Sequence, residues 1–318
     1  MSSGGAIIQA SWASTRERGS WLMMRLMVLG LRLLARPLTT PIVHVVALYF
    51  FVFGRRARAM SRDYLRRIAR QAPASGLGPN ARCVYRHILA FAYAVRDKLD
   101  AWSGRLDYAQ VAFEDQGRLR AMVAADRGVL IIGSHLGNLE VCRALACLNR
   151  RVRLNVLVHT RHAAYFTRVL AMAGASQVEL VQVGDFNAAT ALALKHRIDR
   201  GEWVVIAGDR VPVHGGRTVD VQFLGGTAPL PVGPYLLAAL LECPVCLLFC
   251  LRQAGRNHVY VEPFAEQVRL PRAQREATIA EQAQRFAERL EHYVLRQPLQ
   301  WFNFYPFWRE ELTDEAER

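Results

Sequence analysis

The chain has 318 residues, of which 52% are hydrophobic, and it carries a formal net charge of +14. This length is enough for one large α/β domain with additions, or for two small domains. The six cysteines do not form a disulfide-framework pattern, and no nucleic-acid-binding motif accompanies the basic charge, so a disulfide-rich secreted protein and a nucleic-acid-binding protein are both disfavoured.

The first 70 residues combine most of the positive charge with the most apolar composition of the chain. They contain twelve arginines and no lysine against two acidic residues, which gives about +10 of the total charge. Residues 1–19 are expected to form a flexible N-terminus. A segment that is both basic and apolar is typical of contact with an anionic membrane surface.

Residues 20–72 are predicted to be a membrane anchor followed by a basic helix. Pro37 and Pro41 separate two apolar stretches, 21–34 and 42–53. Neither stretch has the roughly 20 apolar residues of a clean membrane span. One tilted span, a hairpin within one leaflet and an interfacial amphipathic pair all stay open, beside a buried helical hairpin of a soluble protein.

Strands and helices are predicted to alternate along most of the remaining chain. Helices are expected over 55–72, 81–101, 115–126, 138–148, 162–174, 186–199, 231–241 and 274–296, and strands near 108–113, 129–133, 153–158, 178–182, 203–207, 219–223, 244–250 and 257–262. This alternation predicts an α/β fold: a single domain over residues 80–310, with a central, mostly parallel sheet flanked by helices and a short tail at 311–318.

Two C-terminal patterns predict packing. The helix at 274–296 places Ile279, Phe286 and Leu290 on one apolar stripe. The aromatic run at 298–308 is expected to be a packed cap over the domain, with a belt at a lipid interface as the alternative.

The strongest candidate for a catalytic group lies directly after the apolar strand at 129–133. His135 follows this strand in a short loop, and Asn138 is expected to cap the next helix. Glu140 then falls in the first helical turn, where the helix dipole stabilises a negative charge. An imidazole beside a carboxylate can act as a general base with an orienting partner. An ordinary histidine and an ordinary helix-capping glutamate remain the plain alternative.

A second polar loop follows the strand at 203–207, which would place it at the same sheet edge as His135. Arg210 suits a phosphate or carboxylate. Asp209 would hold either Arg210 or His135 in place, or would simply pair with Arg210 in a local turn.

Three further patterns give weaker indications of function. Gly225 and Gly226 lie in a segment predicted to lead from a strand into a helix near Pro231, where backbone N–H groups could hold an anion or an oxyanion, although a plain turn explains them equally well. Arg161 lies in a basic cluster after another strand, and no carboxylate completes a metal-ligand set there. The pair of cysteines in Cys243-Pro-Val-Cys246 is expected to be buried as small apolar side chains.

Taken in order, these motifs resemble those of the lysophospholipid acyltransferase superfamily. The likeness is closest to the bacterial branch of late lipid A acyltransferases and their relatives, and it covers residues 20–308. The first motif of the superfamily, His-x4-Asp/Glu, is matched by His135 and Glu140, and the Gly-Asp-Arg loop and the Gln-Trp-Phe-Asn-Phe tail follow in order. Phe223-Leu224-Gly225-Gly226 departs from the Phe-Pro-Glu-Gly motif of the glycerolipid branch, and the Gly-Asp-Arg-Val-Pro loop is closer to relatives linked to other lipids, including aryl polyene-type lipids. The lipid acceptor is therefore open.

The resemblance implies an acyltransferase for groups other than amino-acyl groups. The donor would be a thioester of acyl carrier protein or coenzyme A, the acceptor a hydroxyl of a lipid precursor, and the location the cytoplasmic face of a bacterial inner membrane with anionic lipid. His135 would be the base, Glu140 would orient it, and substrate binding would involve Asn138, Arg161, Asp209, Arg210, Gly225 and Gly226. No bound cofactor, no metal and no nucleic-acid partner are expected. A membrane-bound α/β hydrolase or glycosyltransferase using the same histidine, and a non-catalytic membrane protein of this fold, remain alternatives.

Overall fold

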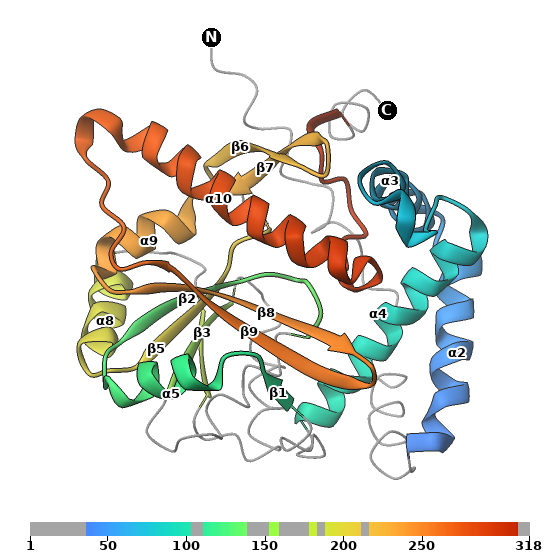
Figure 1. Cartoon of the computed structure of the whole chain (residues 1–318), viewed down its shortest axis with the longest axis horizontal. Helices are drawn as coiled ribbons and strands as arrows, with labels where there is room; N and C mark the ends of the chain where they lie inside the picture. The colour runs from blue at the N-terminus through green and yellow to red at the C-terminus, as the bar shows by residue number, and fades with distance from the viewer. Residues whose placement is uncertain are drawn as a thin grey trace.

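The computed structural model describes residues 36–102, 111–138, 153–158, 178–182, 188–210 and 216–310. A seven-stranded sheet with strand order β1-β9-β8-β2-β5-β3-β4 forms its centre (Figure 1). Its strands are β1 (Val111–Phe113), β2 (Val129–Gly133), β3 (Leu154–Val158), β4 (Val178–Gln182), β5 (Trp203–Ala207), β8 (Val245–Gln253) and β9 (Arg256–Ala265). The predicted α/β architecture is therefore confirmed.

The sheet is mostly parallel, as predicted. Strands β2, β3, β4, β5 and β8 run in one direction, whereas β9 pairs antiparallel with β8, and β1 pairs parallel with β9. All five residues of β2 are buried, and this unbroken apolar sequence is typical of a parallel strand covered on both faces.

Alternate residues of β2 serve two separate cores. Leu130 and Ile132 belong to a large cluster with α8 (Ala188–Asp199), α9 (Gly233–Leu241) and α10 (Arg275–Arg296). Val129 and Ile131 face the other side of the sheet, where the described part of the cluster includes Leu119 of α5 (Gln116–Ala124). The two-residue period of a strand explains this division.

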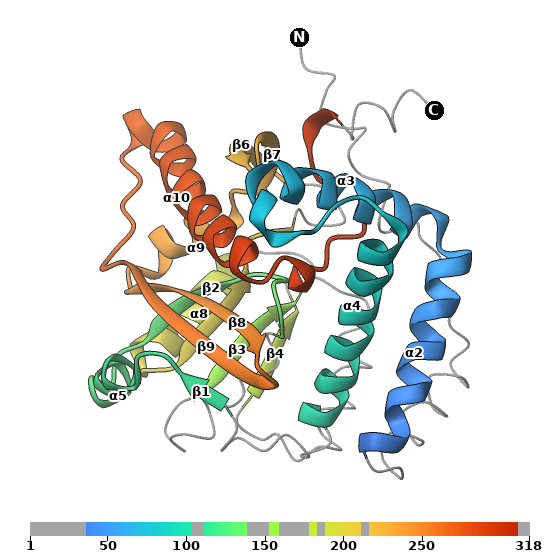
Figure 2. The same ribbon diagram turned by 45° about the vertical axis from the view of Figure 1, so that its right-hand side comes forward.

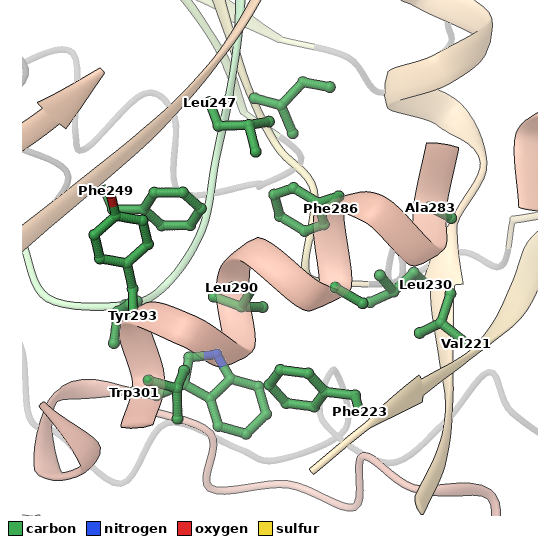
Figure 3. Packing of buried hydrophobic residues seen from close by; sticks show 14 of the residues in the cluster. Val221, Phe223, Leu230, Leu247, Phe249, Ala283, Phe286, Leu290, Tyr293 and Trp301 are labelled. Atoms are coloured by element: carbon green, nitrogen blue, oxygen red, sulfur yellow. The ribbon is translucent and has the colours of Figure 1, made fainter. Parts of the chain in front are cut away.

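Helix α10 covers the first of these faces with its predicted apolar stripe. Ile279, Phe286 and Leu290 are all buried, together with Tyr293 one turn further on. Figure 3 shows this side of the helix between the sheet residues Leu247 and Phe249 and the aromatic pair Phe223 and Trp301.

One segment differs from its prediction. Instead of a loop into a helix, residues 223–234 contain a second strand: β6 (Thr218–Phe223) and β7 (Gly226–Pro231) form an antiparallel hairpin outside the central sheet. Leu224 (φ 48°) and Gly225 (φ 71°) make a two-residue turn in the left-handed region, a geometry that suits the twist of a hairpin. Helix α9 then begins at Gly233.

Three N-terminal helices lie along one side of the domain. They are α2 (Arg36–Phe53), α3 (Arg55–Gln71) and α4 (Ala81–Trp102), and Figure 2 shows α2 and α4 side by side, with α3 across their upper ends. Pro37 and Pro41, which were expected to separate the two apolar stretches, both lie within α2, so neither of them interrupts this helix. Because the stretch 21–34 lies outside the described residues, its separation from α2 stays a prediction. Pro37 lies in the first turn, where the N–H groups have no partner within the helix, whereas Pro41 lies inside α2 and removes one of its backbone hydrogen bonds.

The predicted membrane anchor is only partly covered by the described residues. Its first stretch, 21–34, lies outside them. Among the helices that are described, none combines the length and the hydropathy needed to cross a membrane.

Candidate active site

The site forms where two neighbouring parallel strands end. Strands β2 and β5 pair along their whole length, and beyond them the Gly208 N–H donates to the carbonyl oxygen of Gly133 at 2.9 Å. The chain leaves β2 towards β3 and leaves β5 towards β8, in opposite directions across the sheet. The carboxyl ends of parallel strands are the usual position of a ligand site in an α/β sheet.

His135 and Asp209, from the two loops at this point, form a hydrogen-bonded pair. The Nδ1 atom of His135 lies 2.8 Å from Oδ1 of Asp209, and the backbone N–H of His135 donates to Oδ2 at 2.8 Å. The Asp209 side chain is 2% exposed, whereas the His135 side chain is 30% exposed. A buried carboxylate thus holds an imidazole that remains open to an incoming molecule.

The electrostatics favour a neutral imidazole beside an ionised carboxylate. Burial and the nearby positive charge of Arg210 lower the pKa of His135, although Asp209 acts in the opposite direction. Burial raises the pKa of Asp209, but His135 and Arg210 together outweigh burial and leave this pKa below its usual value. With Nδ1 engaged by Asp209, Nε2 is the nitrogen that can accept a proton at neutral pH.

Arg210 is positioned by the C-terminal aromatic run. Its Nη2 atom donates to the carbonyl oxygen of Phe302 at 3.0 Å, and its guanidinium carbon lies 5.5 Å from the centre of the Tyr305 ring. The charge is therefore held next to the His135–Asp209 pair instead of extending freely into solvent.

The loop that carries His135 is held against β8. Gly137 has φ 68°, and its neighbour Asn138 donates its backbone N–H to the carbonyl oxygen of Cys250 at 3.3 Å. A Cβ atom at Gly137 would overlap that same carbonyl oxygen, so only glycine fits this close approach of two backbones. Asn138 is buried beside the site.

The C-terminal aromatic run packs as a cap, as predicted. Trp301, Phe307 and Trp308 are buried, and Trp301 donates its indole N–H to Oδ2 of Asp209 at 3.3 Å. The sequence did not identify Trp301 as a site residue, because an aromatic side chain in such a run is typical of a hydrophobic core.

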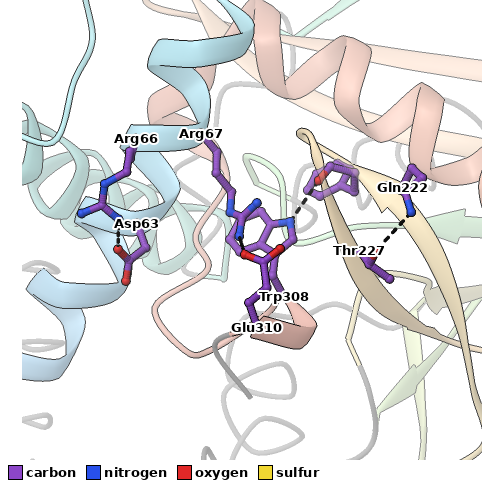
Figure 4. Close-up of polar contacts among 8 residues, drawn as sticks. Asp63, Arg66, Arg67, Gln222, Thr227, Trp308 and Glu310 are labelled. Carbon is purple, nitrogen blue, oxygen red and sulfur yellow. Dashed lines mark hydrogen bonds and ion pairs between the residues drawn. The ribbon is translucent and has the colours of Figure 1, made fainter. Parts of the chain in front are cut away.

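Gly225 and Gly226 do not lie in a loop between a strand and a helix, as predicted, but in a hairpin outside the central sheet. They lie at the turn of the β6–β7 hairpin and pack against α3: a Cβ atom on Gly225 would meet the Gln71 side chain, and one on Gly226 would meet Arg67 and Trp308. Figure 4 shows Arg67 over the Trp308 ring, together with the hairpin residues Gln222 and Thr227. The guanidinium carbon of Arg67 lies 4.2 Å from the centre of that ring. The turn residues were misplaced because β7 was not recognised as a strand.

Two predicted site residues, Glu140 and Arg161, lie outside the described residues. The orienting position at Nδ1 of His135, which the sequence suggested for Glu140, is occupied by Asp209. Holding His135 is one of the roles that the sequence predicts for Asp209.

The cysteines of the Cys243-Pro-Val-Cys246 segment are buried, as expected. Burial raises the pKa of Cys243 to about 11 and that of Cys246 to about 12, which keeps both as unreactive thiols. Within the described part of the chain, no three or more His, Cys, Asp or Glu residues come together in a group that could hold a metal ion.

Comparison with known proteins identifies the family. A family model described as bacterial lipid A biosynthesis acyltransferase matches residues 7–310, which includes both loops of the site and the aromatic cap. No curated protein matches the chain. With a match over nearly its whole length, and with a histidine–carboxylate pair at the carboxyl ends of its sheet, the chain belongs to the bacterial lipid A biosynthesis acyltransferase family.

Proposed function

We propose that the protein transfers a fatty acyl group from a thioester to a hydroxyl of a membrane lipid precursor, with His135 as the general base. The observation that carries the proposal is the exposed imidazole whose Nδ1 atom is fixed by the buried carboxylate of Asp209. Family membership already makes the protein a lipid acyltransferase. The donor, the acceptor and the roles of the individual residues belong to the proposal.

Nε2 of His135 is proposed to take the proton from the acceptor hydroxyl and to return it to the leaving thiolate. The acceptor hydroxyl oxygen attacks the thioester carbonyl carbon while its proton moves to Nε2, and Asp209 stabilises the imidazolium that forms. The C–S bond then breaks, the carbonyl reforms as an ester, and the leaving thiolate takes the proton from Nε2. General-base catalysis of this kind contributes about 10²- to 10⁴-fold to the rate.

Arg210 is proposed to bind an anionic group of the donor or the acceptor, because it lies beside the base and carries a fixed charge. Arg161 and Asn138 are proposed to help bind the same substrates. Glu140 is proposed to act near the reaction centre as a second carboxylate. It would not orient His135, because Nδ1 of His135 already bonds to Asp209.

The donor is proposed to be acyl carrier protein or coenzyme A in thioester form. Both are anionic, and the formal charge of +14 favours their association electrostatically. Exposed arginines on α3, among them Arg62, Arg66 and Arg70, provide part of this positive surface.

Attachment to the cytoplasmic face of a bacterial inner membrane is also part of the proposal. Its support is an apolar stripe on α2: Val45, Leu48, Tyr49, Val52 and Phe53 are exposed at helical spacing, and the exposed Arg55 and Arg56 follow directly. An apolar helix face next to cationic side chains suits the interface of an anionic bilayer.

The test compares two histidines that both contact a carboxylate. His258 pairs with Glu114 between Nδ1 and Oε1 at 2.6 Å, but it lies on β9, which is separated from β2 by β8. Purified His135→Ala should lose transfer from an acyl thioester to the lipid fraction by about 10²-fold or more, whereas His258→Ala should retain it.

Wild-type transfer by His135→Ala would refute the assignment of the base. Release of free fatty acid at the same rate with and without a lipid acceptor would instead indicate a hydrolase. Lipid mass spectrometry of a deletion strain against its parent identifies the acceptor and the acyl length from the missing acyl increment.

A further inference from the structure

Asp209 accepts three hydrogen bonds. Two come from His135, and the third comes from Trp301, which is 92 residues further along the chain. Oδ1 faces Nδ1 of His135, and Oδ2 accepts both the backbone N–H of His135 at 2.8 Å and the indole N–H of Trp301 at 3.3 Å. A carboxylate held by donors at both oxygens has a fixed plane. The direction in which it presents Oδ1 to the imidazole therefore depends on the Trp301 donor.

The backbone around Trp301 also holds the loop that carries the base. We name residues 300–303 the strap. The Gly137 N–H donates to the carbonyl oxygen of Gln300 at 2.7 Å, and the Phe302 N–H donates to that of His135 at 3.4 Å. One short segment thus contacts both members of the His135–Asp209 pair.

The strap is fixed from behind by α3, α4 and β8. His87 of α4 donates from Nε2 to the carbonyl oxygen of Trp301 at 3.0 Å, and its Nδ1 atom lies 2.9 Å from Oγ of Ser61 on α3. The side-chain amide of Gln300 bonds to both backbone groups of Arg252 on β8, at 2.7 and 2.8 Å. These contacts fix the position from which the indole N–H of Trp301 donates to Asp209.

We propose that Trp301 is a positioning residue of the acyl-transfer site, which fixes the Asp209 carboxylate and, through it, the orientation of His135. This inference rests on the proposed function. Loss of a hydrogen bond to a charged group corresponds to about a ten- to a hundredfold effect. The loss should appear in kcat, because Trp301 acts on the base through Asp209 and is not part of the proposed substrate contacts.

A purely structural role for Trp301 is the competing explanation. The ring packs against Tyr64, Phe223 and Phe307 at centroid distances of 4.9–5.3 Å, so any substitution also disturbs the core. The test must therefore separate the lost N–H donor from the lost packing.

Trp308 provides a matched control for this purpose. It is buried in the same aromatic cluster, and its indole N–H also donates to an oxygen, the Phe223 carbonyl, at 2.9 Å. It forms no contact with Asp209. Trp301→Phe and Trp308→Phe each remove one indole N–H and reduce one ring in the same cluster.

Steady-state kinetics with an acyl thioester and a lipid acceptor should show that Trp301→Phe lowers kcat by about ten- to a hundredfold and leaves KM for the thioester within about threefold. Trp308→Phe should keep kcat within about threefold at a temperature where both variants are folded. Equal kcat losses in the two variants would overturn the proposal.

A double-mutant cycle tests the route through Asp209. In an Asp209→Asn background, Trp301→Phe should cause little further loss of kcat, because the carboxylate that it positions has already gone. A full, additive loss would assign Trp301 a role independent of Asp209.

Hydrogen exchange separates this inference from the proposed function. The His135 backbone N–H shares Oδ2 of Asp209 with Trp301, so it should exchange faster in Trp301→Phe than in Trp308→Phe. Should the wild type fail to transfer acyl groups, the proposed function fails, and the exchange rates still decide whether Trp301 positions the pair. Identical exchange in both variants would refute the positioning role.

Discussion

Two buried or half-buried histidines have opposite tasks in this protein. His135 has a side chain that is 30% exposed, and it is the proposed general base. His87 is fully buried and both of its ring nitrogens are hydrogen-bonded, to Ser61 and to the Trp301 carbonyl oxygen. Since a carbonyl oxygen only accepts, Nε2 of His87 carries the proton, and burial lowers the pKa of this side chain to about 4.

The lowered pKa of His87 predicts a pH-dependent stability. In the unfolded chain the side chain takes up a proton below about pH 6.5, but in the folded protein it does so only near pH 4. The stabilisation is therefore complete above pH 6.5, falls as the pH decreases, and levels off below pH 4, a change of about 3 kcal/mol.

Urea unfolding of the wild type and of His87→Gln across pH 4–7 measures this change. The difference between the two stability curves should shrink towards low pH. Parallel curves for wild type and His87→Gln would show that His87 is not held neutral in the folded state.

At the scale of elements, the site depends on a loop that touches the sheet with its backbone. Gly137 combines a left-handed φ of 68° with an approach to Cys250 that leaves no room for a Cβ atom. Gly255, in the turn between β8 and β9, has a similar φ of 81° but open space around it. Comparing substitutions at Gly137 and Gly255 therefore separates the cost of a left-handed φ from the cost of steric overlap.

Gly255→Ala should destabilise the protein by about 1–2 kcal/mol, the usual cost of a left-handed alanine. Gly137→Ala should cost clearly more and should also abolish acyl transfer, because the loop with His135 must move away from β8. Thermal unfolding and thioester turnover of the two variants measure this difference. Equal stability and retained turnover in Gly137→Ala would mean that the loop tolerates displacement.

Elements with local patterns could be predicted from the sequence, and those that depend on distant partners could not. The buried strands β2 and β5 coincide with their predicted ranges, because an apolar run between turn residues is a local signal. Strand β7 was missed because Pro229 and Pro231 lie within it, and proline argues against a central strand but is tolerated in a short hairpin at an edge.

The sequence predicted that the loops of His135 and Asp209 lie at one sheet edge, but not which carboxylate contacts the histidine. His135 and Asp209 were both named, but a partner 74 residues away is not encoded in spacing, and the carboxylate five residues along the chain was the natural first choice for orienting the base. Trp301 is 92 residues from Asp209, and its donor role became visible only in three dimensions.

At the scale of the molecule, one side of the domain exposes an unusual amount of apolar surface. Among the described residues, most of the exposed large hydrophobic side chains lie on α2. The inner side of α2, including Val43 and Ala47, packs against the protein. The helix therefore has two apolar faces, and the outer one matches the proposed contact with lipid.

Charged substitutions on this outer face test the membrane contact. Val45→Asp and Phe53→Asp alter residues that are 67% and 64% exposed on α2, and Leu192→Asp alters a residue that is 57% exposed on α8. In sedimentation with anionic vesicles, each α2 variant should bind at least about tenfold more weakly than the wild type, since burying one such side chain contributes about 1.5–3 kcal/mol.

Leu192→Asp should bind like the wild type, and high salt should weaken binding of both by screening the neighbouring arginines. Unchanged sedimentation of the α2 variants would assign the apolar face another partner.

The strap also has a consequence for the order of events during synthesis. The ribosome completes β2, His135 and Asp209 first, and Trp301 follows 92 residues after Asp209. At about 5–20 residues per second, several seconds separate the two. During this interval a nascent chain contains His135 and Asp209 but not yet Trp301. On the proposed mechanism, the pair is therefore aligned only after Trp301 has been synthesised. A chain released early by interrupted translation would contain His135 and Asp209 but lack Trp301, and we expect it to be inactive in the proposed acyl transfer.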